Sequence, residues 1–584
     1  MAKERTIPTI EAAAEFKIFV NDTEVPRSVT KVAINVMKMV NKISTATLVL
    51  KDGSPAEEDF PLSNDELFLP GNRISISAGG PDETVDIFSG IIIKQSLKIR
   101  SNRDSQLIVA CKHSVIKTTV GRKNACFHDM TDSEVFDKIL KNHGFEPPEL
   151  DIESSSLSHA ELVQYNCTDW DFILSRSEMV GKIIITNDEK IIIRTPTVTG
   201  DAALSLLYGD TIIELDVEMD SRNQYKTVKA KSWEMANQAI GESEANEPTD
   251  LEEQGNLSVN DLAEVLELEE YTLAHSGSLT PEERKAWADA QMLKSRLSKI
   301  RGRVKFRGIA SINPGDVLEL NGIGERFNGK GFVSGVRQDY DGVNGWKTQA
   351  QFGHSPEWFA DENTISATKA GGLVPGVIGL HTGIVTDNED PDGEMRVRVK
   401  FPYINPDDEG VWARMALADA GNERGLFFRP EIGDEVVTGF LYDDPRQPVV
   451  LGMLHSSALP SPLPPSNDNH QKGFTSREKI KMIFDDEKKS IQIETPGGNK
   501  ITISDDEKGI TLEDQNTNKI QMNDSGITIT AAKKLELKAG TELAIGGPDI
   551  KLSGDSAVEI KCGGSTKVES SGSLDLKGSM VKIN

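Results

Sequence analysis

The sequence predicts a mainly β protein that ends in a long stack of short strands. The last fifth of the chain, from Ile491 to Asn584, repeats a unit in which two aliphatic residues flank one polar residue. A polar or Gly-containing break follows each unit. This spacing is that of a strand with one face turned in and the other turned out. Earlier in the chain, short apolar runs alternate with turn residues, which also indicates strands.

The repeat is regular enough to define the fold of this region. From Ile501 to Val581 it recurs with a mean step of about 8 residues. A short fixed period predicts a stacked β array rather than a globular core. Val568 marks one half-filled unit. The complete pairs are Ile491/Ile493, Ile501/Ile503, Ile510/Leu512, Ile520/Met522, Ile527/Ile529, Leu535/Leu537, Leu543/Ile545, Ile550/Leu552, Val558/Ile560, Leu574/Leu576 and Val581/Ile583.

One chain of this array is not expected to stand alone. The two aliphatic side chains of a unit gain less free energy on burial than the ordering of its backbone costs. Units this short favour a prism in which several identical chains each supply one face. A meandering antiparallel sheet is the alternative, and the regularity of the pairs argues against it. Thr528, Glu536 and Ala544 are expected to point outward. The predicted needle core comprises Ile501, Ile503, Ile510, Leu512, Ile527, Ile529, Leu535, Leu537, Leu543, Ile545, Ile550, Leu552, Val558 and Ile560.

Length and charge narrow the possible functions. With 584 residues, the chain is long enough for three or four domains. It carries 92 acidic and 65 basic side chains, which gives a net charge of −27. An acidic surface repels nucleic acid and anionic membranes, so we expect neither as a non-specific ligand.

The cysteines and apolar segments indicate a protein that folds in the cytoplasm. The four cysteines are widely spread and form no Cys-x-x-Cys motif, which supports neither a disulfide scaffold nor a zinc ribbon. The first residues lack the apolar core of a signal peptide, and no apolar run approaches the roughly 20 residues of a membrane helix. If the protein leaves the cell, we expect something to carry it.

Residues 1–120 have the composition of strands and predict a barrel or sandwich, and three helices are marked after them. An acidic segment, residues 241–256, is expected to be a solvated loop or insertion. The helix start signals are Thr131 with Glu134, Thr168 or Asp169, and Thr280–Pro281 with Glu283. The predicted apolar stripe of the third helix is Ala286, Ala290, Leu293, Leu297 and Ile300.

A histidine pair lies near the first helix and is a candidate metal site. His128 and His143 flank that helix, and Cys126 precedes His128 by two residues. The spacing and the available partners do not match a recognised zinc site. We therefore predict no metal and no cofactor.

A compact β segment follows a small, polar boundary near residues 364–372. It contains five short strands in about 80 residues, which predicts a small closed barrel of the OB type. The alternating stretch Met395–Phe401 follows an Asp392–Gly393 turn and is one of these strands. Leu459–Pro465 contains four prolines and predicts a stiff, extended linker to the needle.

The stretch around Asp169–Trp170 and the stretch from Trp412 to Gly452 resemble a known family, the VgrG-type spike proteins of contractile injection systems and related phage tail hubs. The first departs from the family pattern at Cys167–Thr168, where members often have an acidic residue and Ser. The residues that carry the first resemblance are Gln164–Tyr165, Asp169–Trp170, Phe172, Arg176, Glu178 and Gly181. Those that carry the second are Trp412, Arg414, Gly425, Phe428, Pro430, Gly433–Val436, Asp443–Pro445, Pro448–Val450 and Gly452.

The resemblance covers most of the chain and implies four domains. Residues 1–370 would form phage-tail-hub-like domains, two barrels with helical insertions. Residues 373–456 would form an OB-fold collar, and residues 457–475 a Pro-rich linker. Residues 476–584 would form a triple-stranded β-helix needle, a trimeric intertwined β-prism.

The function that the resemblance implies is mechanical. The chain would be the trimeric hub and spike of a contractile injection system, which docks on the inner tube and punctures the target envelope. One alternative is a phage-type tail-spike enzyme that degrades envelope glycans, and the other is a nucleic-acid-binding OB protein, which a basic barrel face would mark. Adjacent carboxylates such as Asp485/Asp486 and Asp505/Asp506 are typical of solvated turns. A glycan-cleaving site needs two carboxyl groups spaced across a groove. We therefore predict that the chain is not an enzyme.

The implied partners follow from the same resemblance. They are two further copies of the chain, inner-tube and baseplate proteins, and a PAAR-type tip protein, with effectors as possible cargo. Membranes would be met only by piercing, and the particle would be assembled in the cytoplasm and released or injected outside. The sequence does not distinguish type VI secretion from an extracellular particle or a phage tail. The expected tip contacts are Met580, Val581, Lys582, Ile583 and Asn584.

Overall fold

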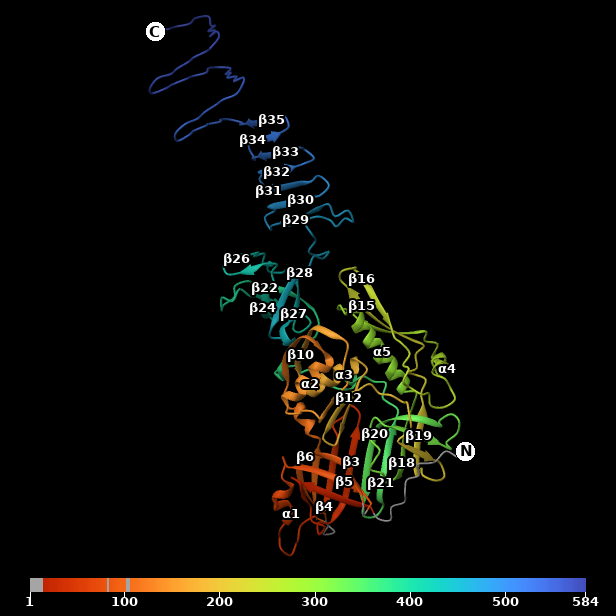
Figure 1. Ribbon diagram of the computed structural model, residues 1–584. Coiled ribbons are helices and arrows are strands. Elements are labelled where there is room, and N and C mark those ends of the chain that lie inside the picture. Colours follow the sequence, from red (N-terminus) through yellow and green to blue (C-terminus); the bar gives the residue numbers. More distant parts are fainter. Residues whose placement is uncertain (1–13, 81–82, 101–104, 584) are drawn as a thin grey trace. The chain divides into compact units, whose positions relative to one another are not determined.

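The computed structural model describes residues 14–80, 83–100 and 105–583, and the chain forms two compact units. One unit is Met1–Val377 with Tyr442–Pro445, and the other is Ile378–Leu441 with Arg446–Asn584. In both, strands predominate over helices, which confirms the predicted mainly β fold class (Figure 1). In the described part of the chain, none of the helices has the length and apolar character needed to cross a membrane.

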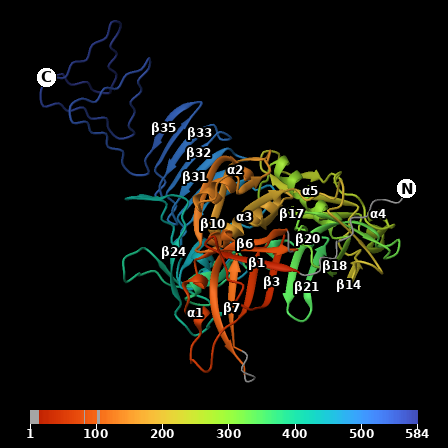
Figure 2. The same ribbon diagram turned by 60° about the horizontal axis from the view of Figure 1, so that its bottom comes forward.

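A 13-stranded sheet forms the base of the first unit, and its two halves have separate cores. The N-terminal half packs around residues such as Leu48 and Phe88, and the other half around Phe306 and Phe352. The halves join where β20 pairs with β3, so the two expected barrels share one sheet (Figures 1 and 2). The strand order is β14-β18-β21-β20-β3-β4-β7-β6-β5-β1-β2, with β13 paired to β19 and β19 paired to β20. The bounds are β1 (Glu15–Val20), β2 (Thr23–Glu24), β3 (Lys31–Met39), β4 (Thr45–Lys51), β5 (Arg73–Gly79), β6 (Thr84–Ile99), β7 (Ser105–Lys112), β13 (Leu204–Leu207), β14 (Glu214–Met219), β18 (Ile300–Arg307), β19 (Val317–Asn321), β20 (Gly329–Asp341) and β21 (Gly345–Phe352).

Smaller sheets and the helices complete the first unit. The sheets are β10-β8, β11-β12-β9 and β16-β15-β17. Their strands are β8 (Lys123–Thr131), β9 (Leu150–Ile152), β10 (Ser158–Cys167), β11 (Ile183–Asn187), β12 (Lys190–Arg194), β15 (Thr227–Glu234), β16 (Ala239–Glu244) and β17 (Glu270–His275). The helices are α1 (Pro61–Asn64), α2 (Asp132–Asn142), α3 (Asp169–Met179), α4 (Val259–Ala263), α5 (Pro281–Leu297) and α6 (Phe359–Glu362). Short 3₁₀ turns are η1 (Glu66–Phe68), η2 (Ser114–Thr119), η3 (Glu264–Leu266), η4 (Lys369–Gly372) and η5 (Leu441–Asp443).

The three predicted helix starts are confirmed as caps. At α2, the Glu134 amide donates to Thr131 Oγ1 at 3.3 Å and the Thr131 amide donates to the Glu134 carboxylate at 2.8 Å. This is the reciprocal capping box that satisfies two backbone donors at once. Thr168, one of the two candidates, caps α3 by accepting the amide of Asp171. At α5, Thr280 and Glu283 form a second capping box.

The predicted stripe of α5 is only partly correct. Ala290 and Leu297 are buried, but Ala286 and Leu293 are only half-buried. The helix ends at Leu297, and Ile300 instead begins β18. The buried face of α5 also carries Arg284, Lys294 and Arg296, whose charges are matched by glutamates. An apolar-periodicity argument misses such a face because it treats every charged residue as exposed.

Of the acidic segment at residues 241–256, the first four residues belong to β16. Residues 245–256 form a loop whose side chains are mostly exposed, as predicted. We call this loop the acidic strap. Arg296 Nη2 donates to the Glu247 carboxylate at 2.9 Å, and Lys330 and Lys299 pair with Glu252 and Glu253 at 2.9 Å and 3.4 Å. Opposite charges on α5, on β20 and at Lys299 just before β18 therefore hold the strap in place.

The second unit begins with a closed barrel of five strands, as predicted for residues 373–456. Its strands follow the order β22-β23-β24-β28-β27. Inward-facing residues such as Val385, Val399 and Val436 fill its interior. The bounds are β22 (His381–Asp387), β23 (Val397–Lys400), β24 (Val411–Met415), β27 (Glu435–Phe440) and β28 (Pro448–Met453), and a separate hairpin is formed by β25 (Ala420–Gly421) and β26 (Arg424–Gly425).

A seven-stranded array follows, and each strand pairs antiparallel with the next. The sequence argued against such a meander, yet it is how residues 471–530 of one chain are arranged. The array starts at Gln471, inside the range 457–475 expected for the linker. Residues 531–583 are described throughout, and no strand forms within them in a single chain. The bounds are β29 (Gln471–Thr475), β30 (Lys481–Asp485), β31 (Ser490–Glu494), β32 (Lys500–Ser504), β33 (Gly509–Glu513), β34 (Lys519–Asn523) and β35 (Gly526–Thr530).

Candidate functional site: an open aliphatic face

The register of the array places its aliphatic residues in two adjacent columns on one face. Antiparallel pairing puts each aliphatic residue directly opposite another, within cross-strand contact distance. Since side chains alternate between faces, both members of every pair share the same face. The first column is Phe474, Met482, Ile493, Ile501, Leu512, Ile520 and Ile529. The second is Phe484, Ile491, Ile503, Ile510, Met522 and Ile527. We call these two columns the aliphatic face.

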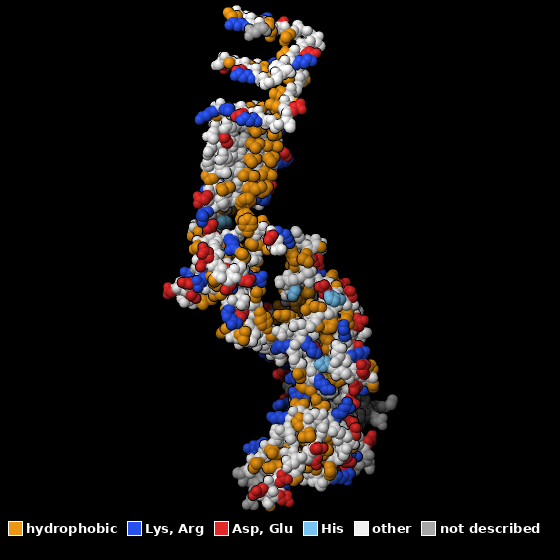
Figure 3. All heavy atoms as spheres, turned by 90° about the vertical axis from the view of Figure 1, so that its left-hand side faces the viewer, with side chains coloured by type: hydrophobic (Ala, Val, Ile, Leu, Met, Phe, Trp, Pro, Cys, Tyr) orange, Lys and Arg blue, Asp and Glu red, His pale blue; other side chains and the backbone are white. Residues whose placement is uncertain are grey.

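The aliphatic face is open to solvent in a single chain. Ile501 is 40% exposed, Ile529 is 50% exposed and Ile527 is 69% exposed. Figure 3 shows hydrophobic side chains running as a continuous band along the array. Single exposed aliphatics are ordinary, but a contiguous apolar patch of this length marks an interaction surface.

The opposite face of the array is polar and carries charges of alternating sign. Its central column reads Gln492, Thr502, Thr511, Gln521 and Thr528. A second column pairs Lys481 with Glu494, Glu494 with Lys500, Lys500 with Glu513, and Glu513 with Lys519. Opposite charges at facing positions favour this register. A slip of one residue would move the aliphatic side chains to the other face of the array. Thr528 therefore lies on the face opposite Ile527 and Ile529.

The remaining predicted core residues lie in residues 531–583, where one chain forms no strand. The structure brings none of them into a packed core. Their exposed fractions run from 53% to 73% for Leu535, Leu537, Leu543, Ile545, Ile550, Leu552, Val558 and Ile560. The expected tip residues Met580, Val581, Lys582 and Ile583 are also exposed, and Asn584 lies outside the described residues.

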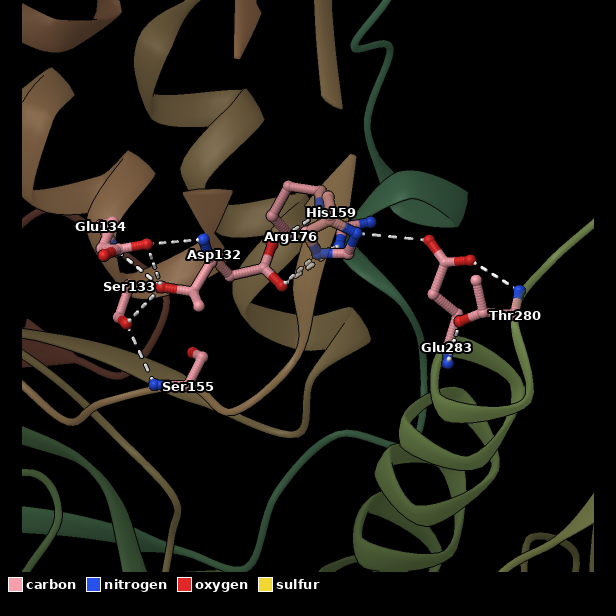
Figure 4. A network of polar contacts seen from close by, with 9 residues as sticks. Asp132, Ser133, Glu134, Ser155, His159, Arg176, Thr280 and Glu283 are labelled. Carbon is pink, nitrogen blue, oxygen red and sulfur yellow. Dashed lines mark hydrogen bonds and ion pairs between the residues drawn. The ribbon is translucent and has the colours of Figure 1, made fainter. Parts of the chain in front are cut away.

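A buried polar network in the first unit is the best candidate for chemistry, and sequence reasoning missed it. His159 Nε2 lies 2.8 Å from Asp132 Oδ2, and His159 Nδ1 lies 3.3 Å from Glu283 Oε1 (Figure 4). Arg176 Nε donates to Asp132 Oδ1 at 2.8 Å. These residues come from α2, β10, α3 and α5, so no local motif announces them.

The geometry of this network fits a structural tie. Asp132 is fully buried, and its two oxygens are occupied by Arg176 and His159. The other carboxylate oxygen of Glu283 caps the start of α5. Each ionisable member thus faces another member or a cap, which is how buried charges are normally satisfied. The network holds the start of α5 against α2, α3 and β10.

Asp485 from the carboxylate pairs and His143 from the histidine pair are likewise committed to local structure. Asp485 accepts hydrogen bonds from Gln471 and from the amide of Lys488 at the β30–β31 turn. His143 Nε2 lies 2.7 Å from Asp169 Oδ2, beside the side chain of Lys123. In the described part of the chain, no group of three or more His, Cys, Asp or Glu residues could hold a metal ion.

Comparison with known families divides the chain into three matched segments. Residues 11–341 match the family described as the Alg8 N-terminal domain. Residues 381–455 match the type VI secretion system/phage-baseplate injector OB domain. Residues 490–560 match the phage baseplate V C-terminal trimerisation domain. The last match covers most of the aliphatic face and continues into the segment that lacks strands.

Curated relatives are spike proteins, matched over short stretches. The type VI secretion system spike protein VgrG4b of Pseudomonas aeruginosa is 37% identical over 99 residues, 15% of this chain and 12% of the relative. VgrG1a of the same organism is 27% identical over 192 residues, 30% of this chain and 29% of the relative. The chain thus spans less than a third of the length of these curated relatives.

Among solved structures, a tail protein from Neisseria meningitidis covers 60% of this chain and 99% of its own, with 12% identity and a TM-score of 0.43. An Escherichia coli component of the type VI secretion system, described as similar to bacteriophage T4 tail proteins, covers 75% of this chain and 100% of its own. Its identity is 13% and its TM-score 0.38.

An OB barrel followed by a strand array with an open aliphatic face defines a phage-baseplate type of spike protein. The Alg8 N-terminal domain match spans more than half of the residues, so the chain belongs to that family. The two phage-baseplate domain matches and the curated relatives identify it as a spike protein of the VgrG type.

Proposed function

We propose that the chain is the homotrimeric hub and spike of a contractile injection system. The observation that carries this proposal is the aliphatic face, which is continuous over seven strands and uncovered within one chain. Three copies placed face to face would enclose the two columns in a shared core. Burial of each large aliphatic would contribute about 1.5–3 kcal/mol. The match to a trimerisation domain supports three as the number of copies.

The segment after the array supports the same assembly. Residues 531–583 keep the spacing of a strand repeat but lack strand partners within the chain. Backbone groups of a strand need hydrogen-bonding partners, and other chains would supply them here. In the trimer this segment would become an intertwined β-helix that extends the prism.

The domain roles follow from this arrangement. Residues 1–370 would form the hub that docks on the inner tube, and residues 373–456 the collar. Residues 457–475 would be the linker, with its last five residues taken up by β29, and residues 476–584 the needle. Sheath contraction would drive the needle through the target envelope, after assembly of the particle in the cytoplasm.

The needle would carry a partner at its C-terminal end. Met580, Val581 and Ile583 are 72%, 51% and 86% exposed in the single chain. Exposed apolar side chains gathered in this way mark an interaction surface. A PAAR-type tip protein would cover this surface, and effectors would travel with the spike.

The proposal assigns no catalysis to the chain. The buried Asp132–His159–Glu283 network and the Asp485 carboxylate are occupied by structural contacts. Catalysis of glycan cleavage needs two carboxyl groups spaced across a groove.

The test of the proposal is the mass of the purified protein in solution. Light scattering is expected to give three times 63.9 kDa. A monodisperse monomer would contradict it.

A further inference from the structure

The collar barrel carries an apolar loop that its own fold does not use. Residues 416–434 connect β24 to β27, and residues 418–429 are exposed throughout. Phe427 is 87% exposed, and Leu426 and Phe428 are each about half exposed. The barrel is already closed and filled without them. We call Leu426–Phe428 the collar finger.

The finger is held in a defined place by contacts at both of its ends. On one side, the Leu426 amide donates to the Asp419 carbonyl at 2.9 Å, beside the β25–β26 hairpin. On the other, Asn388 donates to the Pro430 carbonyl at 2.8 Å. The backbone on both sides of Phe427 is therefore held in place, and the exposed Phe427 side chain projects from a fixed loop.

The finger continues the aliphatic face of the array. The Phe428 ring lies 5.6 Å from the Phe474 ring, centroid to centroid. Phe474 is the first member of the aliphatic column that runs through Met482 and Ile493. Arg477 also pairs with Glu431 at 3.0 Å, which ties the finger's base to the start of the array. The surface that would face the other chains therefore extends from the array into the collar.

A second apolar surface on the same barrel offers a complementary seat. Leu451 and Met453 on β28 are 49% and 48% exposed. Leu380 and Leu451 flank Gly439 on β27, and Gly439 has no side chain to fill the space between them. A three-fold ring joins two different surfaces of neighbouring copies, so a knob and a separate seat are what its closure requires.

We propose that, in the trimer, the collar finger of each copy docks on the Leu380–Leu451–Met453 surface of the next copy. The occupant is a second copy of this chain, because the finger is continuous with the aliphatic face that the proposed trimer buries. This inference rests on the proposed trimer and adds to it a second interface, in the collar. It makes the collar a closed ring of three barrels independently of the needle core.

The experiment joins the two surfaces chemically. A protein with Phe427→Cys and Leu451→Cys, in a background with Cys126→Ser and Cys562→Ser, is treated with a short bismaleimide. Denaturing gels should show covalent dimers and trimers, and neither single cysteine variant should give them. A trimer by light scattering that yields no such ladder would overturn the docking while leaving the proposed function intact. A monomer would overturn both.

A second measurement does not depend on the length of the bismaleimide reagent. Phe427→Asp should leave the trimer intact, because the needle core holds it, but should increase amide exchange in residues 416–434. Val343→Asp is the matched control, since Val343 is 93% exposed in the first unit. Exchange in the loop that is equally fast in the wild type, in Phe427→Asp and in Val343→Asp would also overturn the inference.

Discussion

At the scale of single residues, the alternation of side chains decides which substitutions matter. Ile529 and Thr528 are neighbours in β35, yet they lie on opposite faces of the array. Ile529 ends the first aliphatic column, and Thr528 ends the polar one. The same chemical change at these two positions therefore separates core from surface.

Ile529→Asp should destabilise the trimer strongly, and Thr528→Asp should not. In the trimer three carboxylates would meet in an apolar core, at a cost of at least about 3 kcal/mol. An exposed aspartate on the polar face should change stability by no more than about 0.5 kcal/mol. Thermal unfolding and light scattering measure both effects. Equal losses for the two variants would refute the assigned face.

Glu270 is one of the carboxylates whose ion pairs make the stability of the first unit depend on pH. Hydrogen bonds from Lys229 and Lys231, with a third from Thr272, lower the pKa of Glu270 to about 2. A depressed carboxylate pKa contributes stability that is present above the unfolded value near 4.5 and is lost as pH falls toward 2.

Glu270→Gln should therefore flatten the acid side of the stability profile of the β16-β15-β17 sheet. The measurement is the midpoint of thermal unfolding between pH 6 and pH 2. Glu267→Gln is the control, because Glu267 is a neighbouring exposed glutamate, and its profile should match the wild type. A Glu270→Gln profile as steep as the wild type would show that Glu270 does not carry this dependence.

At the scale of elements, local signals fixed helix starts and strand faces in advance. Thr131 with Glu134 and Thr280 with Glu283 are capping boxes because the signal lies within four residues. The apolar period likewise predicted that the paired residues of the array share one face, and the register places them so. The first array strand was missed because Gln471–Thr475 contains a single large apolar residue, Phe474. Its pairing with Lys481–Asp485 defines it as a strand.

Elements that are stabilised by partners far away in the sequence could not be predicted from sequence patterns. The acidic strap depends on Arg296, Lys299 and Lys330, which are 46 to 78 residues away from their glutamates. The Asp132–His159–Glu283 network joins residues from three elements in the same way. Charge runs and single histidines have no periodicity that reveals such partners.

Two segments of the needle should differ in how they depend on assembly. Residues 471–530 already have strand partners within one chain, and residues 531–583 have none. In the wild-type trimer, amide exchange should be slow in both. In dissociated Ile529→Asp chains, protection should persist in β29–β33 and vanish after residue 531. Protection of residues 531–583 in a verified monomer would show that this segment folds alone.

At the scale of the whole molecule, charge is distributed in a way that suits the proposed assembly. Residues 471–584 carry 18 acidic and 17 basic side chains, so nearly all of the net charge of −27 lies in residues 1–470. Like-charge repulsion opposes association, and it would be small along the array where the three chains approach each other most closely. The acidic hub and collar would keep the particle soluble.

The last prediction concerns the tip. Truncation after Ser570 removes the exposed aliphatics Val581 and Ile583 together with Leu574 and Leu576. Because these residues would form the end surface on which a PAAR-type cap sits, the truncated spike should lose the cap in co-purification while its hub still joins the tube. Val343→Asp, far along the sequence in the first unit, should keep the cap. A truncated spike that retains its cap would place the tip contact elsewhere in the chain.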